Sequence, residues 1–181
     1  PSDIITSIHA DEKGVYTGCH RFGFFASFNE GINWGAFNGG LLSKDVFDIK
    51  SDSINIYIAT YSGIFSKKKN ENSWHSMNGG LTNLQIKDIL YFNRKLYVAT
   101  YGSGIFCSSN YGETWSQNTL GSRIYVSKLE LIDGTFYGLA ADSYPEYYFA
   151  VVKSSDEGIN WQTLNSGFDT GSLRCISGNQ Y

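Results

Sequence analysis

Proline, charged residues and long apolar runs are all scarce in this sequence. Two prolines and 17% charged residues stand beside 20 glycines and 16% aromatic residues, a balance typical of short packed strands joined by tight turns. No run of about 18 apolar residues occurs, so no membrane-spanning helix is predicted. The first residues, PSDIITSIHADEKG, lack the charged start and apolar stretch of a signal peptide.

The chain also lacks a basic excess. Its formal net charge is -3 and its pI is about 5.6, so no positive field exists to attract a nucleic acid or an anionic membrane. We therefore expect neither nucleic acid binding nor membrane insertion.

Cysteine and metal-binding patterns are sparse as well. Cys19, Cys107 and Cys175 cannot all pair within one chain, and they lack the C-x-x-C spacing of a structural zinc site. The three histidines show no metal-binding spacing, and no phosphate loop, nucleophile elbow or Ser-His-Asp arrangement is identifiable. Buried free thiols, no metal and no cofactor are expected.

What the chain has in abundance is repetition. Its four tryptophans are separated by 40, 41 and 46 residues, by subtraction of their positions, which is the period of a propeller blade. Three of them end the motif S-x-[DN]-x-G-x-x-W. The motif residues are Ser27, Asn29, Gly31 and Trp34; Ser108, Asn110, Gly112 and Trp115; and Ser154, Asp156, Gly158 and Trp161. The copy ending at Trp74 departs from it, with Lys67, Lys69 and Glu71 at the Ser, Asp and Gly positions.

Each repeat contains four segments with the composition of strands. Apolar and alternating runs predict first strands at 4–10, 46–51, 86–92 and 126–132, second strands at 14–18, 54–60, 95–100 and 135–140, and third strands at 23–28, 63–68, 104–109 and 148–155. A short polar fourth strand follows each tryptophan. Four antiparallel strands per unit without a helix predict an all-β fold, a β-propeller of four-stranded blades. The blades are expected at about 3–40, 41–80, 81–120 and 121–167, with 168–181 beginning a fifth.

On these motifs the chain resembles the Asp-box, or BNR-repeat, propellers of sialidases, xyloglucan-directed hydrolases, sortilin-type receptors and secreted bacterial proteins. The resemblance implies that the motif is a structural turn, on the face opposite the ligand site. Residue chemistry agrees: Asp or Asn accepts backbone N–H groups, Gly supplies a positive φ, Ser ties down the backbone, and Trp packs over the hairpin. In the departing copy, residues 67–72 are expected to form a solvated loop tip, with a polyanion site as the alternative.

The resemblance also implies six or more blades. Four units and one further strand therefore predict either a longer chain or an open stack, whose uncovered end blades would favour self-association.

Ligands are expected at the loops that join second to third strands, together with the loops between blades. The first of these loops offers His20 and Arg21, a cationic pair suited to a carboxylate. Four arginines at different blade positions, Arg21, Arg94, Arg123 and Arg174, cannot build the three-arginine clamp that the resemblance to sialidases would require. The sequence therefore argues against sialidase activity.

Two further loop features are candidates for binding. The long fourth loop contains Asp142, Tyr144, Glu146 and Tyr147, which could stack on a sugar ring and bond its hydroxyls, or could simply form an elongated hairpin. Asp142 and Glu146 are weak catalytic candidates, since glycoside hydrolysis needs two acids at a defined separation. Tyr61 and Tyr101 follow Ala-Thr in successive units, and form either a shared aromatic platform or repeated packing residues.

The sequence thus predicts a non-catalytic propeller, secreted or at the cell surface, that presents loops to a protein or a glycan. Two alternatives remain open. One is a fragment of a glycoside hydrolase with part of its site in other blades. The other is an assembly module that self-associates through its end blades.

Overall fold

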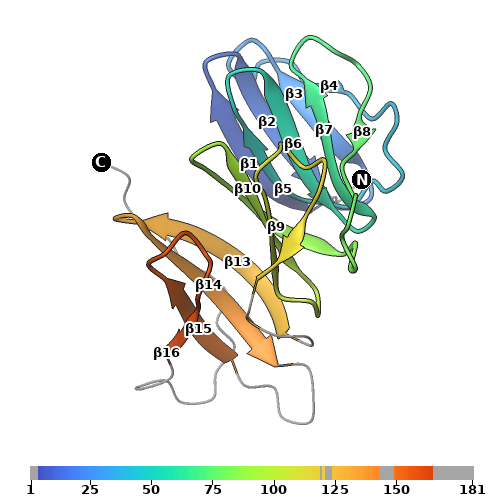
Figure 1. Ribbon diagram of the computed structural model, residues 1–181. Helices are drawn as coiled ribbons and strands as arrows, with labels where there is room; N and C mark the ends of the chain where they lie inside the picture. Colours follow the sequence, from blue (N-terminus) through green and yellow to red (C-terminus); the bar gives the residue numbers. More distant parts are fainter. Residues whose placement is uncertain (1–3, 119, 121–123, 143–148, 165–181) are drawn as a thin grey trace.

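The computed structural model describes residues 4–118, 120, 124–142 and 149–164. These residues form sixteen strands, with no helix among them. The strands build four separate four-stranded antiparallel sheets, each in simple chain order (Figure 1). The predicted all-β architecture is confirmed.

Each sheet is one repeat of the sequence. Blade 1 contains β1 (Ile5–Asp11), β2 (Gly14–Cys19), β3 (Gly23–Ser27) and β4 (Gly35–Ala36), and blade 2 contains β5 (Val46–Ser51), β6 (Asn55–Thr60), β7 (Gly63–Lys68) and β8 (His75–Ser76). Blade 3 contains β9 (Ile86–Phe92), β10 (Lys95–Thr100), β11 (Ile105–Ser108) and β12 (Ser116–Gln117). Blade 4 contains β13 (Ile124–Ile132), β14 (Thr135–Asp142), β15 (Phe149–Ser154) and β16 (Gln162–Leu164).

The blades stack in chain order with their first strands side by side. Strand β5 contacts β1 and β9, and β9 contacts β13, so these four strands line the inner side of the stack. Because each blade is an up-and-down meander, its connections alternate between two ends. We call the end with the turns from second to third strand and the connections between blades the loop end. The opposite end, with the motif turns, is the box end.

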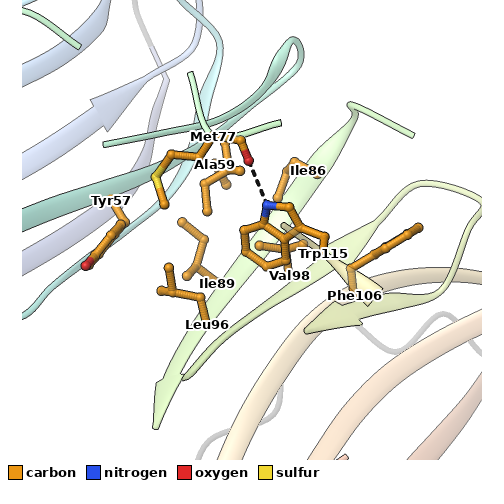
Figure 2. Close-up of a cluster of buried hydrophobic side chains, with 10 residues drawn as sticks. Tyr57, Ala59, Met77, Ile86, Ile89, Leu96, Val98, Phe106 and Trp115 are labelled. Carbon is orange, nitrogen blue, oxygen red and sulfur yellow. Dashed lines mark hydrogen bonds between the residues drawn. The ribbon is translucent and has the colours of Figure 1, made fainter. Parts of the chain in front are cut away.

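Alternation of side chains along the strands gives every blade two apolar faces. In the second strands, Tyr57 faces the following blade, whereas Leu96 faces the preceding one. The cluster between blades 2 and 3 is drawn in Figure 2, and it consists of Tyr57, Ala59, Ile64, Met77, Ile86, Ile89, Leu96, Val98, Phe106 and Trp115. Equivalent clusters join blades 1 and 2 and blades 3 and 4. The core is therefore divided among the junctions between blades.

The motif turns share one hydrogen-bond pattern. In blade 1 the Ser27 hydroxyl donates to Asn29 Oδ1 (3.0 Å) and accepts the Gly31 N–H (2.9 Å), while Asn29 Oδ1 also accepts the Asn33 N–H (2.9 Å). The turns of blades 3 and 4 repeat these bonds at 2.7–3.0 Å. Gly31 has φ 85°, and Glu30 before it also has a positive φ of 58°, a left-handed pair that the expectation for glycine alone missed.

The indole N–H groups of the four tryptophans find their acceptors in two different places. Trp74 Nε1 donates to Phe37 O and Trp115 Nε1 donates to Met77 O, both at 2.7 Å and both across to the preceding blade. Trp34 and Trp161 instead donate to the carbonyls of Gly31 and Gly158 in their own turns, at 3.0 Å. The prediction concerned packing of the ring over its own hairpin, and the Trp115 ring does lie close to Gly112 of its own turn; the bonds to the preceding blade are an additional feature that the sequence did not predict.

The turn of blade 2 closes differently because Lys67 replaces the motif serine. Lys67 is only 3% exposed, and its Nζ donates to Glu71 O at 3.0 Å. The ammonium also lies over the rings of Phe24, Phe37 and Trp74, 5.1–5.7 Å from their centroids, where cation–π attraction offsets part of the burial cost. Lys67 is thus a buried structural residue, and the expectation of a fully solvated loop tip over residues 67–72 is wrong at this position.

Two buried carboxylates fasten the inner strands to one another. Asp48 Oδ2 on β5 accepts the Ile89 N–H of β9 (3.1 Å), and Asp88 Oδ2 on β9 accepts the Leu129 N–H of β13 (2.6 Å). First strands of neighbouring blades do not pair as a sheet, so these side chains satisfy backbone donors that would otherwise lack partners. Lys50 pairs with Asp48 and Lys128 with Asp88.

Candidate functional site

Each first strand carries a β-bulge next to the loop end. The pairing register shifts between Ile5 and Ser7, between Val46 and Asp48, at the β9 pairing of Thr100 with Ile86, and between Val126 and Lys128. One residue per blade is left over at the same position: Thr6, Phe47, Lys87 and Ser127. Bulges of this kind re-aim a side chain away from the sheet, and here they bring four different side chains to one end of the inner strands.

Around Lys87 these side chains form a contiguous group. Lys87 Nζ lies 3.9 Å from the ring centroid of Phe47 and 5.6 Å from that of Tyr101. The Tyr101 ring packs on Tyr125, with centroids 4.8 Å apart, and the two residues also share a backbone bridge. We call Phe47, Lys87, Tyr101 and Tyr125 the aromatic–lysine cluster. It spans blades 2, 3 and 4.

The electrostatics of the cluster follow from partial burial. Desolvation lowers the pKa of Lys87, and the Asp45 carboxylate works in the opposite direction. Burial raises the pKa of Tyr125 and the neighbouring Tyr101 adds to this, whereas the Ser127 hydroxyl opposes it. The cluster therefore places one cation and two phenol hydroxyls among aromatic rings.

His20 and Arg21, two of the residues proposed from the sequence, contact Asp45. Asp45 in turn acts electrostatically on Lys87 of the aromatic–lysine cluster. His20 Nδ1 is 2.8 Å from Asp45 Oδ1, and the Arg21 N–H donates to the same oxygen at 2.9 Å. His20 thus already faces a carboxylate of its own chain, while the Arg21 side chain is exposed. Asp45 fixes the first loop, and the Arg21 side chain is exposed beside it.

Tyr61 and Tyr101 occupy the same position in successive blades. Tyr61 is 51% exposed and Tyr101 is 53% exposed, so neither is a core packing residue. The backbone of each is tied to the connection before its blade, Tyr61 N to Asp45 O and Tyr101 N to Gln85 O. Both rings are available at the loop end.

The fourth loop contributes less to the described site. Asp142 ends β14, where it pairs with Ile124. Tyr144, Glu146 and Tyr147 lie outside the described residues, so the binding and catalytic expectations placed on this loop remain predictions.

At the box end, the turns of blades 1 and 2 enclose a pocket of about 360 Å³, lined by His9, Ala10, Asp11, Glu12, Lys13, Ser51, Asp52, Ser53 and Lys69. Its polar groups bond one another. Asp11 accepts the Ser51 hydroxyl (2.6 Å), the Tyr16 hydroxyl (3.1 Å) and the Lys69 ammonium (2.7 Å). Burial opposes ionisation of Asp11, but the bonds from Lys69 and Ser51 outweigh it and hold its pKa well below the usual range.

The same pocket brings together His9, Ser51 and Asp11. The direction of their hydrogen bonds does not activate the Ser51 hydroxyl as a nucleophile. His9 Nε2 is 3.0 Å from Ser51 Oγ, yet Ser51 gives its single proton to Asp11, so the imidazole must donate to Ser51 instead of accepting from it. A hydrolytic triad needs the reverse direction. The trio is a structural network that joins blades 1 and 2.

The described residues supply no metal cluster, and the neighbouring acids of the inner strands are buried. No group of three or more His, Cys, Asp or Glu side chains among them could hold a metal ion. Asp48 and Asp88 are close neighbours, but they are 6% and 2% exposed, out of reach of a substrate. In the same part of the chain no helix could span a bilayer.

The blades, their inner strands and the inter-blade clusters define a β-propeller. Residues 43–173 match the family described as DUF6242 beta propeller domain, and the chain belongs to this family. No curated protein matches the sequence.

Solved structures share the fold at low identity. The extracellular domain assigned to the one component system BT4673 of B. thetaiotaomicron superposes with a TM-score of 0.75 and 14% identity, over 99% of this chain and 24% of that one. The GH74 enzyme of Niastella koreensis gives 0.70 and 12%, over 88% of this chain and 30% of that one. The computationally designed Ika4 protein gives 0.59 and 12%, over 82% of this chain and 92% of that one. The chain thus spans about a quarter of the first structure, and these similarities show the fold alone.

Sequence reasoning missed Phe47, Lys87 and Tyr125. Their strands were predicted, but the bulges that turn Phe47 and Lys87 toward the loop end leave no local mark in the sequence. One signal was present: at the bulge position the four repeats read Thr6, Phe47, Lys87 and Ser127, whereas the position before it is apolar in every repeat. Variation inside an otherwise regular repeat could have singled out this position.

Proposed function

We propose that this chain is a non-catalytic propeller domain that binds a glycan or a protein at its loop end. The observation that carries the proposal is the aromatic–lysine cluster, which joins three blades and places a half-exposed tyrosine beside a cation. Aromatic faces with adjacent hydroxyls suit both the apolar face and the hydroxyls of a sugar ring. Tyr61, exposed at the equivalent position of the preceding blade, extends the surface.

The motif turns support a finer family relationship. We propose that they are Asp boxes, because serine, Asn or Asp, and glycine form the same three hydrogen bonds in blades 1, 3 and 4. These turns lie at the box end, away from the proposed binding surface. The sequence signature and the structural pattern together favour an architectural role.

An extracellular or cell-surface location is part of the same proposal. Three of the structural neighbours are extracellular domains of B. thetaiotaomicron proteins. Periplasmic or surface fractionation of the native host, followed by immunodetection, tests the location. Detection only in the cytoplasmic fraction would reject it.

The binding proposal is tested by screening the purified chain against a glycan array, then measuring hits by titration calorimetry. Replacing Tyr101 with Ala should weaken binding about three- to tenfold, the value of one aromatic contact. The matched control is Tyr111→Ala, because Tyr111 is 49% exposed but lies in the motif turn at the box end. Equal losses in the two variants, or unchanged binding in Tyr101→Ala, would reject the loop end as the site.

A second function, assembly, is favoured by the uncovered face of blade 1. Ile8 and Trp34 are 71% and 43% exposed, whereas the residues at the same positions of blade 2, Ile49 and Trp74, are 0% and 3% exposed. The face that covers them belongs to the preceding blade and carries Tyr16. Blade 4 presents Tyr137 at the corresponding position of β14, so a second copy of this chain offers the matching face.

We therefore propose as the alternative that blade 4 of one copy docks on blade 1 of another. Light scattering should then show a mass that rises with concentration, and Ile8→Glu should abolish the rise. Ile54→Glu is the control, since Ile54 is 60% exposed in the turn between β5 and β6. A monomer mass that does not change with concentration would reject assembly through the end blades and would leave the binding proposal unaffected.

A further inference from the structure

Two lysines of this protein are enclosed by aromatic rings, and they differ in one respect. Lys67 has an acceptor, because its Nζ donates to Glu71 O at 3.0 Å. Lys87 lies 3.9 Å from the Phe47 centroid and 5.6 Å from that of Tyr101, but among the described residues no hydrogen bond or ion pair engages its Nζ. An ammonium has three donors and is strongly hydrated. Lys87 therefore keeps its donors available for a ligand.

The position of Lys87 is set by the fold. Its bulge in β9 turns the residue out of the regular pairing, while the neighbouring Asp88 remains buried and bonded to Leu129 N. The ring contacts then restrict where the ammonium can lie. A cation that is already ordered and partly dehydrated loses less entropy and less hydration when it meets an anion than a free surface lysine does.

The surroundings of Lys87 favour a negatively charged ligand. Among the described residues of the loop end, the permanent cations Arg21, Lys44 and Lys87 stand against two carboxylates, Asp45 and, at the end of β14, Asp142. Asp45 is already engaged by His20 and by the Arg21 N–H. The local balance is therefore positive, although the whole chain has a formal net charge of -3.

The aromatic rings and hydroxyls around Lys87 favour a saccharide over a peptide as the negatively charged ligand. The ring of Tyr101 is 53% exposed and packs against Tyr125, which gives a flat apolar surface beside the ammonium. The phenol groups and the Ser127 hydroxyl add donors and acceptors at the edge of this surface, the chemistry that matches ring hydroxyls.

We propose that the aromatic–lysine cluster binds an acidic saccharide, with Lys87 Nζ donating to the carboxylate of a uronic acid unit whose ring lies on Tyr101. This inference rests on the proposed binding function and names its ligand class. A charge-assisted bond from Lys87 would be the feature that separates acidic from neutral sugars at this surface.

The experiment is titration calorimetry of the intact chain with oligogalacturonate and with a glucuronate-containing oligosaccharide, each beside its methyl-esterified form. The acid forms should bind about tenfold more tightly than the esters, as one hydrogen bond to a charged group provides. Lys87→Met, which keeps the aliphatic stem, should bring the acids to the affinity of the esters, and Lys87→Arg should restore most of the difference. Lys67→Met is the matched control and should leave the ratio unchanged.

A measurement on the unmodified chain guards against a variant that fails to fold. Raising the NaCl concentration should weaken binding of the acids and leave binding of the esters nearly constant. If acids and esters bind alike, the acidic ligand is rejected while saccharide binding stands. If neither oligosaccharide binds in any form, but a poly-glutamate peptide does, the inference is overturned and the ligand is a protein. If no probe binds, the inference and the proposed binding function both fail.

Discussion

The inter-blade role of the motif tryptophans leads to a sharp comparison between two residues at the same repeat position. Trp115 is 7% exposed and donates to Met77 O at 2.7 Å (Figure 2). Trp34 is 43% exposed and donates only within its own turn. We expect Trp115→Ala to be far more destabilising than Trp34→Ala.

The magnitudes follow from burial and hydrogen bonding. Removing a buried tryptophan side chain costs about 3–5 kcal/mol, and leaving the Met77 carbonyl without its donor adds about 1–3 kcal/mol. Trp115→Ala should therefore lower the free energy of unfolding by roughly 4–8 kcal/mol. For Trp34, only part of the ring is removed from water and no contact between blades is lost, so about 1–2 kcal/mol is expected.

Urea denaturation followed by circular dichroism measures both values on the same chain. Because loss of one junction can uncouple the blades on its two sides, the Trp115 variant should also show a broader transition with a smaller m value. Equal destabilisation by the two substitutions would refute the assignment of Trp115 to the junction. A Trp34 variant that is the more damaging of the two would refute it as well.

Three further predictions concern turns and carboxylates. Gly40→Ala should lower the melting temperature more than Gly134→Ala, although both glycines have a positive φ (84° and 75°). A Cβ at Gly40 would lie 2.5 Å from a backbone oxygen, whereas one at Gly134 would meet nothing within 4 Å. Equal decreases in thermal melts would show that the strain of the positive φ alone matters. The bonds from Asn160 and Ser154 lower the pKa of Asp156 to about 2, so the contribution of Asp156 to stability is present above its unfolded pKa and is lost as the pH falls toward 2. Asp156→Asn should make the loss of stability in acid smaller and change stability little at neutral pH, since the equivalent turns of blades 1 and 3 use Asn. An unchanged loss of stability in acid, measured by urea denaturation at several pH values, would contradict this. Burial and the neighbouring Asp48 raise the pKa of Asp88 well above its usual range. The folded state therefore keeps a proton that the unfolded chain loses from about pH 4 upward, and the free energy of unfolding falls as the pH rises from there toward the raised pKa. Asp88→Asn should make this fall with pH shallower, and a pH dependence identical to that of the parent chain would disprove the prediction.

The regular features of the fold could be read from the sequence because they depend on local pattern. The predicted run at 86–92 is β9 and the run at 95–100 is β10, with the same bounds. Here alternation and β-branched or aromatic residues mark a strand directly, and the tryptophan interval marks the blade.

Features that depend on partners from another repeat could not be read in this way. The acceptor of Trp115 is Met77, and nothing near Trp115 in the sequence indicates whether its indole bonds its own turn or the preceding blade. Lys67 reads as an ordinary charged residue in a charged run, yet the rings that enclose it come from two blades. Such contacts are a property of the stack.

The candidate site shows the same division. Tyr61 and Tyr101 were found because a repeated residue at a loop is visible in the sequence. Lys87 and Tyr125 were not, because a bulge and a contact between blades 3 and 4 bring them together. Asp48 and Asp88 could have been noticed, since a carboxylate inside an apolar strand is unusual unless it has a specific partner.

The direction of the tryptophan bonds has a consequence for synthesis of the chain. The indoles of Trp74 and Trp115 donate to carbonyls that precede them by 37 and 38 residues, so blades 2 and 3 are each completed against a blade that is synthesised before them. Because chains acquire structure from the N-terminal side as they emerge, the acceptors of Trp74 and Trp115 are in place before these tryptophans appear. A translational pause after a complete blade would therefore be tolerated, whereas a pause before the tryptophan would leave that blade without its anchor.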